Sequence, residues 1–169
     1  MKITAVFGCL GLAVFLSASR LTAEFVYVPA SAFHTQDESG GLWLEGMYGQ
    51  YVYRASTGHG WLYAPVLIPD GAVIKNARLL YYDNGGYIEF HFYRYNMYSG
   101  SAHMLFNGTT VGLPDSTAIR ALVDSSVSPL APSYRKVHAN ALSYTVRVSL
   151  SQLGDTLRIY GFVIEYQLP

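Results

Sequence analysis

Apolar and polar residues alternate over many short segments of this chain, most clearly between Tyr87 and Asn96. The apolar positions there are Ile88, Phe90 and Phe92, and the polar positions between them are Glu89, His91 and Tyr93. A period of two is typical of a strand with one buried face. Val73 to Asp83 is a second long strand, and Asp83-Asn84-Gly85-Gly86 offers the positive φ angles of a tight turn. The sequence predicts a central β-hairpin from these two strands.

The final segment, Thr156 to Gln167, is apolar on both faces. Strict alternation places Leu157, Ile159 and Val163 on one face and Tyr160, Phe162, Ile164 and Tyr166 on the other. This pattern predicts either a central strand or a strand whose outer face is covered by another chain.

Outside the N-terminus, no stretch shows a sustained helical period. Roughly eight to ten short strands, with turn signals about every 8–12 residues, predict an all-β fold. We expect a single antiparallel β-sandwich, jelly-roll-like, over residues 24–169.

Residues 1–23 have the features of a secretory signal peptide: Lys2, an apolar run from Ile3 to Leu16, and small residues before a cleavage site after Ala23 or Ser19. The apolar run is shorter than the roughly 18–20 residues that span a bilayer. Cys9 is the chain's one cysteine, so the mature chain would contain no disulfide. We therefore predict a secreted, periplasmic or cell-surface protein from a bacterium, with no membrane span after cleavage.

The mature chain carries little charge. All eleven acidic residues remain, whereas loss of Lys2 and Arg20 removes two of eleven basic residues. This balance gives no reason to expect nucleic acid or an anionic membrane as a partner.

Catalytic and metal-binding patterns are not evident. There is no Gly-x-Ser-x-Gly elbow, and the five histidines lack local metal-ligand spacing. We expect no cofactor, no metal and no enzymatic activity. One enzymatic alternative stays open: a glycoside hydrolase needs two facing carboxylates, and the candidates are Asp37, Glu38, Glu45, Asp83 and Glu89.

The aromatic content is the unusual feature, with fifteen tyrosines and two tryptophans. Tyr87, Tyr93 and Tyr95 share the strand face opposite Ile88, Phe90 and Phe92. Such a face could contact a second copy of the chain, stack on the rings of a glycan, or only stabilise the sheet by cross-strand pairing. The candidate ligand or interface residues are Tyr87, Tyr93, Tyr95, Trp43 and Trp61.

Two short patterns add a resemblance. The segment from Ala64 to Ala72, which contains Ile68-Pro69-Asp70-Gly71-Ala72, is followed by Leu80-Tyr81-Tyr82-Asp83-Asn84. These resemble turn and core features of uncharacterised secreted bacterial β-sandwich proteins, with Arg94 as the arginine that ends the next strand. The resemblance implies an exported jelly-roll-like sandwich and transfers no activity or site.

The sequence thus predicts an exported, non-catalytic structural or interaction protein that self-associates through a tyrosine-rich sheet face. The alternative is a carbohydrate-binding module that uses exposed aromatic residues.

Overall fold

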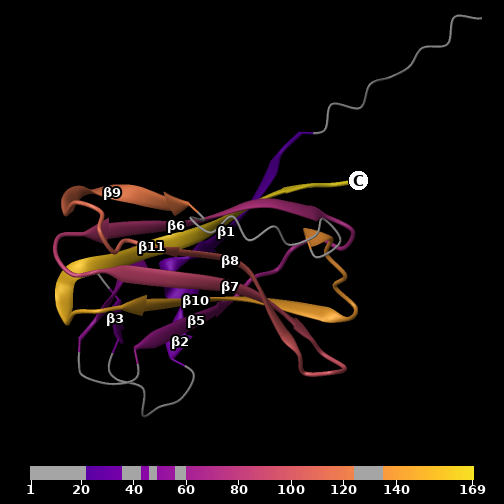
Figure 1. Ribbon diagram of the computed structural model, residues 1–169, viewed down its shortest axis with the longest axis horizontal. Coiled ribbons are helices and arrows are strands. Elements are labelled where there is room, and N and C mark those ends of the chain that lie inside the picture. The colour runs from indigo at the N-terminus through magenta and orange to yellow at the C-terminus, as the bar shows by residue number, and fades with distance from the viewer. Residues whose placement is uncertain (1–21, 36–42, 46–48, 56–59, 124–134) are drawn as a thin grey trace, which may run out of the picture.

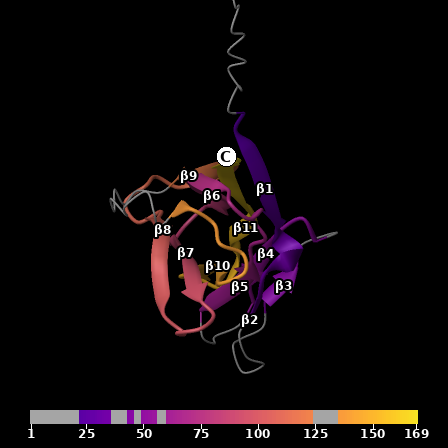
Figure 2. The same ribbon diagram turned by 90° about the vertical axis from the view of Figure 1, so that its right-hand side faces the viewer.

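The structure is a computed structural model that describes residues 22–35, 43–45, 49–55, 60–123 and 135–169. Residues 1–21, which hold nearly all of the predicted signal peptide, lie outside these ranges. The described residues form two antiparallel sheets, seen as two layers in Figure 1 and end-on in Figure 2. Among the described residues, no helix has the length and hydrophobicity needed to cross a membrane.

The first sheet has six strands in the order β3-β4-β11-β6-β9, and β1 also pairs with β11. Its strands are β1 (Glu24–Pro29), β3 (Trp43–Glu45), β4 (Val52–Arg54), β6 (Val73–Asp83), β9 (Ser116–Val123) and β11 (Gly154–Gln167). A short 3-10 turn, η1 (Ala30–Ala32), follows β1. The long strand β11 pairs with β6 along one side, and with β1 and β4 on the other, so it is a central strand. This confirms the first of the two interpretations of its apolar faces.

The second sheet has five strands in the order β2-β5-β10-β7-β8. They are β2 (His34–Thr35), β5 (Trp61–Pro65), β7 (Ile88–Asn96), β8 (Ala102–Thr109) and β10 (Leu142–Leu150). From β4 onward the chain changes sheet at every connection except the one between β7 and β8, and β4-β11-β6-β9 faces β5-β10-β7-β8. Two opposed four-stranded layers in this order form a jelly roll, which confirms the predicted fold class.

The core lies between the sheets and is aromatic at its centre. The Phe162 ring of β11 lies 5.6 Å from the Phe90 ring and 5.4 Å from the Phe92 ring of β7, centroid to centroid. All three side chains are fully buried. Gly108 of β8 is needed beside them, because a Cβ at that position would lie 2.5 Å from the Phe90 ring.

The predicted central hairpin is wrong. β6 pairs with β9 and β11, whereas β7 pairs with β8 and β10, so the turn after Asp83 crosses between sheets. Gly85 and Gly86 do have positive φ angles. The turn is held by other elements: the Asp83 carboxylate accepts hydrogen bonds from the Thr110 hydroxyl and the Gly85 amide, and the Asn84 amide donates to the Thr156 carbonyl. The glycine-rich turn fits either connection, and distant partners decide which one forms.

The predicted faces of the last strand are also wrong beyond Ile159. The pairing of β11 with β6 shifts between Ile159 and Gly161, which is a β-bulge. Beyond the bulge Phe162, Ile164 and Tyr166 turn inward to join Leu157 and Ile159 in the core, and Val163 turns outward. Only glycine fits at position 161 of this bulge, because a Cβ there would lie 2.7 Å from the Val28 carbonyl oxygen.

Candidate functional site

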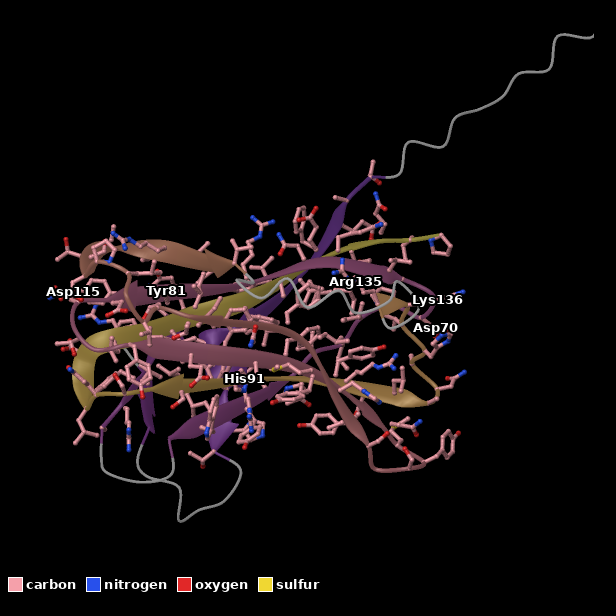
Figure 3. All side chains as sticks on the ribbon, in the orientation of Figure 1. Asp70, Tyr81, His91, Asp115, Arg135 and Lys136 are labelled. Atoms are coloured by element: carbon pink, nitrogen blue, oxygen red, sulfur yellow. The ribbon has the colours of Figure 1, made fainter. Side chains whose placement is uncertain are left out.

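The outward side of the five-stranded sheet gathers rings and charged groups on three neighbouring strands. We call this surface the aromatic face, and it comprises Trp61 and Tyr63 of β5, Glu89, His91, Tyr93 and Tyr95 of β7, and Arg147 of β10. The strand register places Arg147 opposite Tyr63 on one side and His91 on the other. Figure 3 shows His91 near the middle of the sheet.

The face forms because β7 and β10 pair in an unbroken register, from Leu142 opposite Asn96 to Leu150 opposite Ile88. Without a bulge, alternate side chains stay on one side along the whole pairing. The inward set of β7, Ile88, Phe90 and Phe92, is fully buried, as the alternation predicts. The outward set remains partly accessible.

Arg147 lies at the centre of the aromatic face, between two rings. Its guanidinium carbon is 4.3 Å from the Trp61 ring centroid and 5.0 Å from the Tyr93 ring centroid. A guanidinium over an aromatic face gains a favourable cation–π interaction. Its Nε and Nη2 atoms also donate to Nδ1 of His91, at 3.0 Å and 2.8 Å. These contacts fix the position of a positive charge on an otherwise aromatic surface.

His91 connects Arg147 to a carboxylate. Because Nδ1 accepts from Arg147, Nε2 carries the proton of the neutral ring and donates it to Glu89 Oε1 at 3.1 Å. Burial lowers the pKa of His91, and the adjacent Arg147 lowers it further, while Glu89 opposes the shift. The imidazole is therefore held neutral, in one orientation, as an acceptor for the arginine.

The rings continue along β7 towards its end. The Tyr93 and Tyr95 ring centroids are 5.9 Å apart, and the Trp61 ring lies 5.0 Å from the His91 ring. Burial raises the pKa of Tyr95, and neighbouring Tyr93 raises it further, so its phenol stays protonated at neutral pH. The face thus combines flat apolar surfaces with hydroxyl, carboxylate and guanidinium groups.

Of the residues predicted from sequence, the structure brings Trp61, Tyr93 and Tyr95 together on this face. Tyr87 is also exposed but lies just before β7, where its amide donates to the Ser151 hydroxyl and its carbonyl accepts from the Ser151 amide. Trp43 begins β3, in the other sheet, and its side chain lies outside the described part of the structure.

Sequence reasoning did not select Arg147 or Tyr63. Both occupy outward positions of alternating strands, which is a detectable signal. Their meeting with Trp61 and Tyr93, however, requires the order β5-β10-β7, which no local pattern supplies.

The outward side of the six-stranded sheet has a different character. We call this surface the apolar face, and it comprises Phe25 and Tyr27 of β1, Leu80 of β6, Ile119 and Val123 of β9, and Val163 of β11. Phe25 and Ile119 are each 57% exposed. The Arg78–Glu165 ion pair lies among these side chains, because Arg78 stands opposite both Val163 and Val123.

An arginine also lies between two rings on that sheet. The Arg158 guanidinium carbon is 4.6 Å from the Tyr51 ring centroid and 4.8 Å from the Tyr82 ring centroid. Unlike Arg147, Arg158 pairs directly with a carboxylate, at 2.8 Å between Nη2 and Asp155 Oδ2. Its charge is therefore neutralised within the protein.

A cavity of about 540 Å³ lies where β5 and β7 end and β10 begins, lined by Pro65–Pro69, Met97, Ala139 and Leu142–Tyr144. Ser143 of this lining stands opposite Tyr95, so the cavity adjoins the aromatic face. Its lining holds no charged side chain and is mainly apolar. It has the size of a small-molecule site but few groups that could orient a polar ligand.

Asp83 and Glu89, the two candidate carboxylates whose side chains the structure describes, lie in different surroundings. Asp83 is 5% exposed and hydrogen-bonded within the core, whereas Glu89 lies on the aromatic face. Asp37 and Glu38 lie outside the described residues, as does the Glu45 side chain. Within the described ranges, no group of three or more His, Cys, Asp or Glu residues is arranged to hold a metal ion.

No family model and no curated protein matches the chain.

Proposed function

We propose that this protein is a glycan-binding module and that the aromatic face is its binding surface. The observation that carries the proposal is the combination of Trp61, Tyr93 and Tyr95 with the hydrogen-bonding groups of Arg147 and Glu89 on one regular sheet. A pyranose ring has an apolar C–H face and a rim of hydroxyl groups, so it needs both kinds of surface at once.

The adjoining cavity supports the proposal less well than the face does. Its mainly apolar lining suits the apolar side of a ligand but leaves the hydroxyl groups of a sugar without partners. We therefore assign the sugar rings to the aromatic face. The predicted export through residues 1–23 is consistent with a ligand outside the cytoplasm.

The proposal is tested with a glycan array and two matched variants. Tyr93 packs against Arg147 as Tyr82 packs against Arg158 on the opposite sheet. Tyr93→Ala should weaken binding about tenfold, which corresponds to roughly 1.4 kcal/mol, and Tyr82→Ala should leave it unchanged. Equal effects of the two substitutions, or no binding to any glycan on the array, would overturn the proposal.

A second candidate function is self-association. Exposed Phe25, Tyr27, Ile119 and Val123 favour a contact with another copy, because large apolar and aromatic side chains are typical of interface cores. This second proposal assigns the contact to the apolar face, whereas the sequence analysis predicted the tyrosine-rich face. A dry homotypic contact would have to desolvate charged groups on either face: the Arg147 network on the aromatic face and the Arg78–Glu165 pair on the apolar face. Both functions are compatible, because the two faces lie on opposite sides of the sandwich.

A further inference from the structure

Arg147 and Arg158 have similar aromatic surroundings and different charge partners. Each guanidinium lies within 5.0 Å of two ring centroids. Arg158 has Asp155 as an ion-pair partner, and Arg78, the cation above Phe25, has Glu165. Arg147 has no ion pair with any of the described residues. It is a positioned cation on the aromatic face whose charge the protein does not cancel directly.

The Arg147 guanidinium donates to the imidazole of His91, whereas the Arg158 guanidinium donates to the carboxylate of Asp155. Arg147 donates to a neutral nitrogen, and the nearest carboxylate in that chain of hydrogen bonds, Glu89, is bound to the far side of the imidazole. The imidazole therefore orients the guanidinium without neutralising it. A fixed cation of this kind has the property required of an anchor for an anion, because little conformational entropy is lost when the anion binds.

The hydrogen-bonding capacity of Arg147 is only partly used. A guanidinium has five N–H donors, and only Nε and Nη2 of Arg147 donate to a described residue, both to His91. Both Nη1 hydrogens and one on Nη2 have no partner among the described residues. The Nη1–Nη2 edge can therefore make the paired hydrogen bonds that suit a planar carboxylate.

We propose that Arg147 binds the carboxylate of an acidic sugar, so that the ligand of the aromatic face is a uronic-acid-containing glycan. This inference rests on the proposed glycan-binding function and narrows it. A sugar ring whose carboxylate pairs with Arg147 would pack against Trp61 and Tyr93, the two side chains that contact the guanidinium. The sugar carboxylate would pair with Arg147 as the Asp155 carboxylate pairs with Arg158.

The experiment measures the affinity of the full chain for polygalacturonate and alginate, and for the same polymers after their carboxyl groups are reduced to alcohols. Reduction keeps the sugar rings and removes the charge. At least one acidic polymer should bind about tenfold or more tightly than its reduced form, as expected for a charge-assisted bidentate pair. Arg147→Gln should abolish this preference, Arg147→Lys should retain part of it, and Arg158→Gln should leave it intact. Far-UV circular dichroism shows whether each variant is folded.

Each contrary result has a separate meaning. Equal binding of acidic and reduced polymers would overturn the carboxylate assignment and leave glycan binding in place. Dextran sulfate binding as tightly as the acidic polymers would also overturn it, since general attraction between charges would then be sufficient. If no polymer binds, the assignment fails, and the glycan array decides separately whether the wider proposal fails with it.

Discussion

The two outward sheet faces use similar residues in opposite ways. Each has a strand on which an arginine is held between two aromatic rings. On the six-stranded sheet, the Asp155 carboxylate pairs with the arginine. On the five-stranded sheet, a neutral histidine takes the place of the carboxylate, and hydroxyl and charged groups surround the cation. Aromatic content alone therefore does not define a binding surface, because the partner of the cation decides whether its charge is available.

The largest expected effect concerns the bulge that sets the apolar face. Gly161→Ala should destabilise the protein by about 3 kcal/mol or more, because the added Cβ would lie 2.7 Å from the Val28 carbonyl oxygen, and backbone cannot move as a side chain can. Chemical denaturation measures the loss. Gly112→Ala is the control, since Gly112 also has a positive φ but has no atom within 4 Å of its added Cβ. Equal losses in the two variants would show that only backbone conformation matters at Gly161.

A second prediction separates the two faces by their role in association. Light scattering across a concentration range should show that wild-type protein forms an oligomer and that Phe25→Ser with Ile119→Ser lowers its mass. The physical reason is the loss of two side chains that are each 57% exposed. Replacing Tyr87, Tyr93 and Tyr95 together by Ser should not change the mass. The reverse pattern would assign the interface to the tyrosine-rich face, and a monomeric wild type would end the self-association proposal.

The third prediction uses pH to test whether the histidine that contacts Arg147 is neutral. Folding lowers the pKa of His91 below 6.5, mainly through burial and then through Arg147. The unfolded chain therefore binds more protons than the folded chain just below pH 6.5, so stability falls as pH decreases from 6.5 through the folded pKa. Urea midpoints measured from pH 7.5 to 5 should fall less steeply in His91→Gln than in the wild type. Parallel curves would show that His91 is not held neutral as described.

The smallest effect is expected at the arginine that the protein neutralises. Asp155→Asn should lower stability by less than about 1 kcal/mol, because the Asp155 side chain is 59% exposed and water screens its pair with Arg158. Thermal unfolding at low and moderate salt would check this value. A loss above about 2 kcal/mol would mean that Asp155 supports the sheet itself and is a poor reference for Arg147.

The regular part of the fold could be predicted from the sequence, and the long-range part could not. Alternation in β7 identified the buried set Ile88, Phe90 and Phe92 and the outward set that includes Tyr93 and Tyr95. It failed in β11, since one bulge at Gly161 exchanges the faces of every later residue. The turn at Gly85 and Gly86 was located correctly, but the strands that it connects lie in different sheets.

The candidate site could also be predicted only in part. Trp61, Tyr93 and Tyr95 stand out because of their residue type. Arg147 does not, because its significance depends on having His91 beside it instead of a carboxylate, and that depends on how β10 aligns with β7. Cross-strand register is set by the whole sheet, so a single strand cannot reveal it.

The central claim, that a glycan binds the aromatic face, is tested most directly by the fluorescence of Trp61. The chain has two tryptophans, so a Trp43→Phe variant leaves Trp61 as the only one. Titrating this variant with the most tightly bound glycan of the array should change the intensity or wavelength of its emission, with saturation at the calorimetric dissociation constant. Saturable binding with unchanged Trp61 emission would place the ligand elsewhere on the molecule and contradict the account.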